Sequence, residues 1–167
     1  MSVLECGIES ERRIRHRRTA HIVGAVAATA VGAVIASLAT DTSSAWYQSL
    51  TLSPIQPPPW VFGAVWTVLY VLLAVSFARV ASGRYAYRPA ITGYIINLIL
   101  NALWSPIFFK LHAPAWALVV MAALIVNLVV LMRNVLRVDR PAFYMLIPYL
   151  AWLSIAAVLN VSILVLN

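Results

Sequence analysis

Five long apolar runs dominate this chain of 167 residues, and they constrain its fold more than any other feature. They cover approximately residues 22–39, 59–78, 90–109, 115–132 and 141–166. Each run is close to the ~20 residues that an α-helix needs to cross a bilayer. Only 10% of the residues are charged, whereas a soluble domain has about 25%, so the surplus apolar surface must face lipid. We therefore predict an all-α integral membrane protein built as a bundle of five transmembrane helices.

The first 20 residues form a polar segment with five arginines between positions 12 and 18. A basic segment followed by an apolar run is also typical of a cleaved signal peptide. The run that follows is long for that purpose, and small residues recur along it at every fourth position: Gly24, Ala28, Gly32 and Ala36. Because a face of small residues favours close helix packing in lipid, we favour a retained helix. The chain is thus divided into a basic N-terminal segment, 1–20, and a transmembrane domain, 21–167.

The basic residues lie almost entirely on one side of the predicted membrane. Eleven belong to the N-terminus, the second loop and the fourth loop: the five arginines above, then Arg79, Arg84, Arg88, Arg133, Arg137 and Arg140. The opposite side has only Lys110. Since Lys and Arg concentrate in cytoplasmic loops, we expect a multi-pass protein with its N-terminus inside and its C-terminus outside. The net charge of +7 therefore indicates topology, and no nucleic-acid partner is expected.

Several kinds of chemistry lack their usual residues in this sequence. No Asp, Glu, Lys or Arg lies within the apolar runs, which argues against an ion-coupled pump. His16 and His21 fall on the predicted inner side and His112 on the outer side, so they cannot share a metal ion. The single cysteine, Cys6, excludes an internal disulfide and a cysteine-based metal cage. We see no arrangement for nucleophilic catalysis, and predict no catalytic residue, metal or cofactor.

The stretch from Trp46 to Tyr70 leads from a predicted loop, 41–58, into the second apolar helix. Proline suits the first turn of a helix and restricts the residue before it to extended conformations. The prolines at 57–59 therefore predict a stiff, extended segment over 53–58 and a helix that begins near Pro59. We interpret the loop from 46 to 58 as a lid over a binding wall.

Three predicted helices each carry aromatic residues on one face. The faces are Phe62, Trp66 and Tyr70; Asn97, Asn101, Trp104 and Phe108; and Tyr149, Trp152, Ala156 and Asn160. Asparagine amides are costly in hydrocarbon, so these faces should point inward. Pro106 and Pro148 would kink two of these helices and open space between them. The faces could enclose a flat, mostly apolar ligand; ordinary helix packing, with the amides joining helices, is the alternative.

The motifs WYQSL, QPPPWVFGAVWTVLY, NALWSPIFF and PYLAW, followed by a later LN pair, occur in this order. The chain thereby resembles the translocator protein family (TspO/MBR, the peripheral-type benzodiazepine receptor family) over about residues 22–167. The resemblance implies a five-helix bundle, usually a homodimer, with a pocket beneath the first loop that binds porphyrins and synthetic isoquinoline or benzodiazepine ligands. Family pocket residues match this chain at Tyr47, Trp66, Tyr70, Asn101, Trp104, Trp152 and Ala156.

By this resemblance the protein is expected to be a membrane receptor or sensor for tetrapyrroles, with protoporphyrin IX as a ligand and not a cofactor. Two alternatives stay open. One is light-dependent porphyrin degradation, because Trp66 and Trp152 match tryptophans linked to that activity in some bacterial relatives. The other is transport of tetrapyrroles or lipids. The sequence does not decide whether the protein forms a homodimer.

Two stretches depart from the family pattern. Many relatives read K-P-x-aromatic-x-P-P in the first loop, but residues 52–58 here read LSPIQPP, without the lysine or the aromatic residue. Lid closure and ligand preference therefore do not follow from the resemblance. Animal relatives carry a cholesterol motif with a tyrosine and a basic residue near the C-terminus. The corresponding LNVSILVLN has neither, so the sequence does not support steroid handling through that motif.

Overall fold

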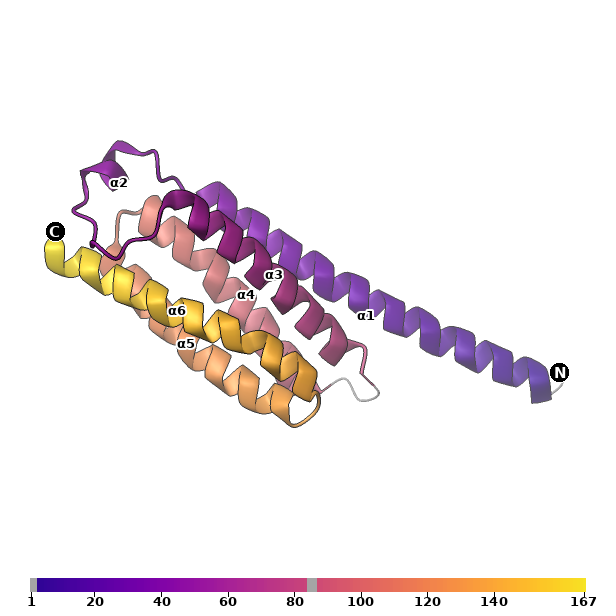
Figure 1. Ribbon diagram of the computed structural model, residues 1–167. Coiled ribbons are helices and arrows are strands. Elements are labelled where there is room, and N and C mark those ends of the chain that lie inside the picture. Colours follow the sequence, from indigo (N-terminus) through magenta and orange to yellow (C-terminus); the bar gives the residue numbers. More distant parts are fainter. Residues whose placement is uncertain (1–2, 84–86) are drawn as a thin grey trace.

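The computed structural model describes residues 3–83 and 87–167, with side chains from residue 16 onward except residue 17. Arg84, counted above among the basic residues of the second loop, lies outside the described residues. The regular elements are all helices: α1 (Val3–Ala39), α2 (Ala45–Ser49), α3 (Pro59–Ala81), α4 (Arg88–Phe109), α5 (Pro114–Leu136) and α6 (Arg140–Leu166). Figure 1 shows the long helices packed side by side, with the two termini at opposite ends.

Five helices in the described part of the chain are long and apolar enough to cross a membrane. They are Arg18–Ala39 within α1, and the whole of α3, α4, α5 and α6. The predicted fold class is thereby confirmed, and α3 begins at Pro59 as expected. The main difference in boundaries concerns α1, which starts at Val3 and continues without a break into its apolar part. Its N-terminal portion extends beyond the rest of the bundle (Figure 1).

The loop between the first two spans is more ordered than the sequence predicted. It contains the short helix α2, whose first turn is capped by Ser44, because the serine hydroxyl accepts a hydrogen bond from the amide of Tyr47. The extended segment predicted for 53–58 is interrupted by a turn in which the amide of Gln56 donates to the carbonyl of Ser53 at 2.9 Å. Proline restricts the residues before it but does not exclude a turn, in which it is a frequent residue.

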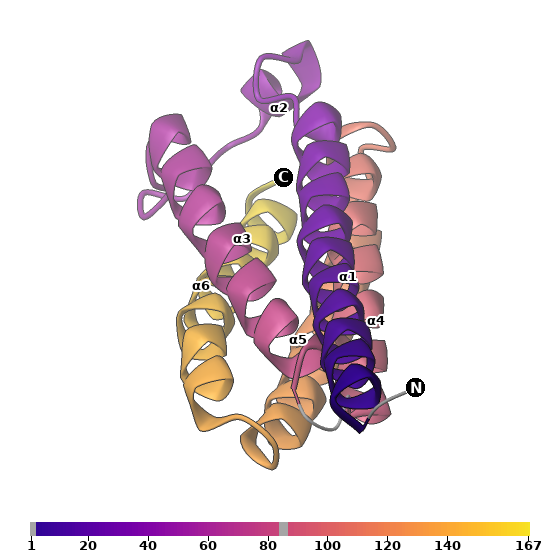
Figure 2. The same ribbon diagram turned by 90° about the vertical axis from the view of Figure 1, so that its right-hand side faces the viewer.

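The five long helices form a ring in the order α1, α3, α6, α5, α4, with α4 again beside α1. Figure 2, turned by 90°, shows α1 between α3 and α4.

One end of the ring is held by an ion pair between α3 and the start of α6. Arg79 lies 3.1 Å from Asp139, and Asp139 also accepts a hydrogen bond from the amide of Ala142. Asp139 therefore caps the first turn of α6 as well as pairing with Arg79.

Close packing between α4 and α5 depends on a glycine. A Cβ atom built on Gly93 would lie 3.0 Å from the Leu131 side chain, closer than ordinary van der Waals contact.

The small-residue face predicted on α1 is only partly buried, because Gly32 and Ala36 face the bundle whereas Gly24 and Ala28 are exposed. The buried face is rotated slightly and includes Ala25, Thr29, Gly32, Ala36 and Ala39.

Basic residues gather at one end of the bundle. The arginine-rich part of α1, the end of α3, the start of α4, and the connection between α5 and α6 lie at the same end (Figure 1). The loop that contains α2 lies at the other end, with the C-terminus. This separation agrees with the alternation expected of five spans. The orientation with the N-terminus inside stays a prediction from the charge distribution.

Gly93→Ile is expected to lower the thermal stability of the protein in detergent. Overpacking a filled helix contact costs about 1–3 kcal/mol, and the new side chain would meet Leu131. Gly24→Ile is the matched control, because nothing lies within 4 Å of a Cβ atom built on Gly24. Melting temperatures of the two variants, measured side by side, check this expectation. Equal melting temperatures would show that the α4–α5 contact tolerates a larger side chain.

Candidate functional site

A partly open cavity of about 740 Å³ lies within the ring of helices. Its wall is built by α1, α3, α4 and α6, with Met121 and Leu124 from α5, and the segment around α2 contributes Tyr47, Leu52, Gln56 and Pro57. The volume lies within the ~300–1,000 Å³ typical of small-molecule sites. Among the described residues that line it there is no charged side chain and no histidine. The cavity is therefore suited to a ligand with a large apolar surface.

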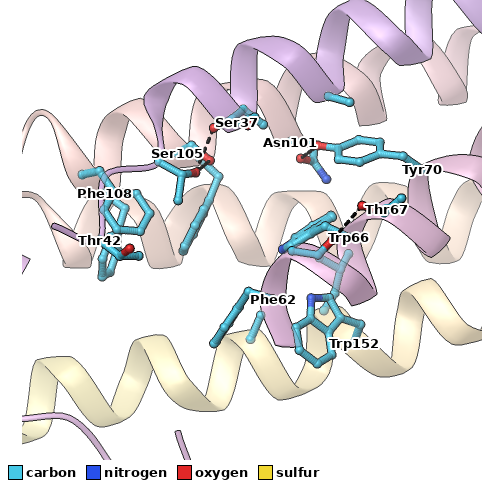
Figure 3. Close-up of a pocket in the computed structure, with 18 of the residues that line it drawn as sticks. Ser37, Thr42, Phe62, Trp66, Thr67, Tyr70, Asn101, Ser105, Phe108 and Trp152 are labelled. Carbon is cyan, nitrogen blue, oxygen red and sulfur yellow. Dashed lines mark hydrogen bonds between the residues drawn. The ribbon is translucent and has the colours of Figure 1, made fainter. Parts of the chain in front are cut away.

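Aromatic rings from α3 and α6 meet on one side of this cavity. Phe62 packs edge-on against Trp152, with ring centroids 5.5 Å apart. Trp66 lies one turn further along α3, and its ring is 5.4 Å from that of Tyr70. Figure 3 shows Phe62, Trp66 and Trp152 directed toward one another from the two helices. Phe62, Trp66 and Tyr70 share a face of α3 because they are spaced by four residues.

The wall on α4 begins with a stacked pair of rings. Trp104 lies parallel to Phe108, with centroids 5.1 Å apart and an angle of 17° between the planes. Asn101, one turn earlier, is 5% exposed and also lines the cavity. Two opposite walls of the cavity therefore present aromatic faces, and a planar ligand between them would contact rings on both sides.

The part of the cavity wall that α1 forms was not predicted from the sequence. It consists of small side chains at three- and four-residue spacing: Val26, Thr29, Ala30, Ala33, Ala36, Ser37 and Thr40. These residues leave room opposite the aromatic rings. The small residues of the alanine-rich first run could have indicated this wall, but the sequence analysis explains them by helix packing alone. Both roles occur, since Gly32 packs against Leu98 of α4 while Ala33 faces the cavity.

The segment around α2 forms the end wall of the cavity, and rings attach it to α4. Trp46 contacts Phe108 of α4, with centroids 5.5 Å apart, and stacks on His112 of the α4–α5 connection at 4.4 Å. Tyr47 contacts Phe109 of α4 at 5.5 Å. The side-chain amide of Gln56 donates to the Tyr47 hydroxyl at 3.2 Å. Burial raises the pKa of Tyr47 above its ordinary value, so its phenol stays neutral.

The C-terminal residue holds the same segment from the opposite side. The backbone amide of Thr51 donates to the side-chain oxygen of Asn167 at 2.8 Å, and the side-chain nitrogen of Asn167 donates back to the carbonyl of Thr51. Trp60 at the start of α3 and Trp116 at the start of α5 are strongly exposed. Their exposure agrees with the interfacial position that tryptophan favours in membrane proteins, whereas Trp46 is packed against α4.

A continuous chain of hydrogen bonds leads from the cavity into the bundle. The Tyr70 hydroxyl donates to the Asn101 oxygen at 2.8 Å, and the Asn101 nitrogen donates to the Tyr149 hydroxyl at 2.7 Å. Tyr149 in turn donates to the Asn97 oxygen at 3.0 Å, and the Asn97 nitrogen donates to the Asn127 oxygen at 3.2 Å. Helices α3, α4, α5 and α6 are thus connected, and Asn101 is held in one orientation on the cavity wall.

Four buried polar atoms on the cavity wall have no hydrogen-bond partner within the described part of the chain. Two are donors, the indole nitrogens of Trp104 and Trp152, and two are acceptors, the side-chain oxygens of Gln56 and Asn160. Buried polar groups are normally satisfied, because an unpaired donor or acceptor costs about 1–3 kcal/mol. Unpaired groups on the wall of a cavity indicate where polar atoms of a ligand would be placed.

The structure places all seven residues expected at a binding site on the wall of this single cavity. They are Tyr47, Trp66, Tyr70, Asn101, Trp104, Trp152 and Ala156. The inward direction of the three predicted faces is seen directly, but two of their members lie behind the wall. Asn97 and Tyr149 are buried between helices and support Asn101. Of the amides on these faces, Asn101 and Asn160 line the cavity, whereas Asn97 joins helices.

The described residues define a class of protein: an all-helical, multi-pass membrane protein with five candidate spans arranged around one aromatic-lined cavity. Residues 25–166 match the TspO/MBR family, and the chain belongs to this family. The family predicted from the motifs is thereby confirmed.

Curated relatives include bacterial and animal proteins. The chain is 35% identical to the tryptophan-rich protein TspO of Chlorobaculum tepidum, over 77% of this chain and 84% of that protein. It is 34% identical to the tryptophan-rich sensory protein of Cereibacter sphaeroides, over 73% of this chain and 77% of the relative. It is also 34% identical to the translocator protein of Homo sapiens, over 69% and 70% respectively.

Tyr149→Phe is expected to lower the free energy of unfolding by about 1–3 kcal/mol. The change leaves the Asn101 nitrogen and the Asn97 oxygen without their buried partner. Tyr144→Phe is the matched control on the same helix, because Tyr144 is 62% exposed. Thermal or chemical unfolding in detergent compares the two. If both variants unfold like the unmodified protein, the hydrogen-bond chain does not stabilise the bundle.

Proposed function

We propose that this protein is a membrane receptor or sensor that binds a flat tetrapyrrole, such as protoporphyrin IX, in the cavity beneath the α2 segment. The observation that carries the proposal is the wall itself, in which tryptophans from α3, α4 and α6 surround one uncharged space of suitable volume. Tetrapyrroles are planar, with an apolar face and a few polar atoms. One relative is named a tryptophan-rich sensory protein, which agrees with a sensory role.

In this proposal the indole rings of Trp66, Trp104 and Trp152 contact the faces and edges of the ligand. Asn101 and Tyr70 supply hydrogen bonds without breaking the chain behind the wall. An asparagine amide has two N–H donors, and Asn101 uses one of them for Tyr149. The Tyr70 oxygen keeps its acceptor lone pairs, because its hydrogen is directed to Asn101. The segment around α2 covers the entrance, and its residues Tyr47, Leu52, Gln56 and Pro57 face the ligand.

Two alternatives use the same cavity. In light-dependent degradation, Trp66 and Trp152 would react with the photoexcited porphyrin, so a Trp66→Phe/Trp152→Phe variant would form product more slowly under light. In transport, the protein would move a labelled porphyrin across liposome membranes, which a receptor does not do. The proposed partners are thus a porphyrin and membrane lipid, with the α2 segment outside and the arginine-rich end inside.

Ala156→Phe is expected to raise the dissociation constant for protoporphyrin IX by about tenfold or more. The larger ring would project into the cavity, and overpacking a filled site costs about 1–3 kcal/mol. Ala151→Phe is the matched control on α6, because Ala151 is exposed and does not line the cavity. Titration with tryptophan fluorescence measures both constants. Equal affinity in the two variants would place the ligand elsewhere.

Porphyrin affinity is expected to depend little on salt, changing less than about twofold between roughly 0.05 and 0.5 M potassium chloride. Salt screens interactions between charges, and the described lining of the cavity has none. The dimethyl ester of protoporphyrin IX, which lacks carboxylates, is the matched control ligand. A steep loss of affinity for the acid alone would mean that its carboxylates are paired with basic side chains outside this wall.

A further inference from the structure

Besides the end that the α2 segment covers, the cavity is open on one side of the bundle. On α4, α5 and α6, every described residue that lines the cavity is buried or partly buried. On α1 and α3, several residues that line the cavity are exposed: Val26, Ala30, Ser37, Gly63, Thr67 and Val71. Residues that line a cavity and are also exposed mark the place where the cavity reaches the surface. We call these six residues the α1–α3 window.

The packing of α3 explains why this window is open. All buried residues of α3 fall between Leu69 and Ala81, and the part of the helix that precedes Leu69 has none. At the arginine-rich end, α1 and α3 are joined, because the His21 ring is hydrogen-bonded to the Ala81 carbonyl at 2.9 Å. Toward α2 the two helices diverge (Figure 2). Nothing lies within 4 Å of a Cβ atom built on Gly63, so the space beside the window is free of protein.

The surroundings of the window are the hydrocarbon of the bilayer. All six residues belong to the candidate spans Arg18–Ala39 and Pro59–Ala81. The Thr67 hydroxyl is already bonded to the carbonyl of Gly63 in its own helix, and the described lining of the cavity behind the window carries no charge. An apolar chain that passes from the bilayer into the cavity therefore meets no charged group that would have to lose its solvation.

We propose that an acyl chain of a membrane lipid enters the cavity through the α1–α3 window and occupies it when no other ligand is bound. Side chains around an unfilled apolar space lose dispersion contacts, and the lipid chains beside α1 and α3 are the apolar groups nearest to this space. Because the window extends toward the α2 end of the spans, the chain can enter while its headgroup stays at the membrane surface. This inference concerns the cavity and does not require its ligand to be a tetrapyrrole.

The first test uses the unmodified protein in liposomes of a phosphatidylcholine that carries a photoactivatable diazirine near the middle of one chain. After illumination, mass spectrometry locates the lipid adducts on α6, a helix that does not border the window. Trp152 and Asn160 line the cavity and are 9% and 2% exposed, so adducts on them report a chain inside the cavity. Val158 is 53% exposed and outside the cavity, so its adducts report the surrounding lipid. We expect both kinds, and adducts on Val158 alone would overturn the proposal.

The second test narrows the window. Gly63→Phe is expected to lower the ratio of Trp152 and Asn160 adducts to Val158 adducts at least about threefold, because the ring takes up the space that the chain needs. Gly24→Phe is the matched control, since Gly24 is equally free of neighbours but does not line the cavity. The same ratio in both variants would contradict entry through the window. Porphyrin affinity is measured separately by fluorescence titration, so a failure of this proposal is distinguishable from a failure of the proposed function.

Discussion

Polar side chains decide where the helices of this protein meet. Apolar side chains gain little by leaving lipid for the bundle, since both surroundings are apolar, so packing and hydrogen bonds must hold the helices together. Tyr149 is the central residue in this respect, because it is buried and bonded to both Asn101 and Asn97. Through these two asparagines it connects α6 to α4, and the connection continues to Tyr70 on α3 and Asn127 on α5.

The cavity follows from an unequal distribution of side-chain size around this framework. Small residues of α1 face large rings on α3, α4 and α6, so the ring of helices cannot close completely at this level. The hydrogen bonds behind the wall fix Asn101 and Tyr70, and the stacked pair Trp104 and Phe108 fixes the α4 side. A hollow with fixed walls needs less reorganisation to accept a ligand than one formed by mobile side chains.

Much of this arrangement could be predicted from the sequence, because the membrane simplifies the problem. The five spans could be predicted from uncharged runs of the right length and from the arginines on one side. The inward direction of Trp66 and Trp152 could be predicted from residue spacing along their helices. Asn127 and the α1 wall could not be found in this way. A small residue such as Ala33 carries no chemical signal, and whether it contacts a helix or a cavity depends on the rotation of α1 by a few tens of degrees. Which residues form hydrogen bonds between helices depends on the order of the helices in the ring. The spacing of residues along one helix does not reveal that order.

The two ends of the bundle are held by different kinds of contact, and this difference bears on where a ligand enters. At the arginine-rich end, Arg79 and Asp139 form an ion pair between the end of α3 and the cap of α6, and the cap also anchors the first turn of α6. Opening that end would break charged contacts and a helix cap together. At the other end, α2 has no buried residue and is attached through ring contacts, Trp46 with His112 and Phe108 and Tyr47 with Phe109, and through Asn167. Within the described residues these contacts include no ion pair, which favours movement of the α2 segment over opening of the arginine-rich end.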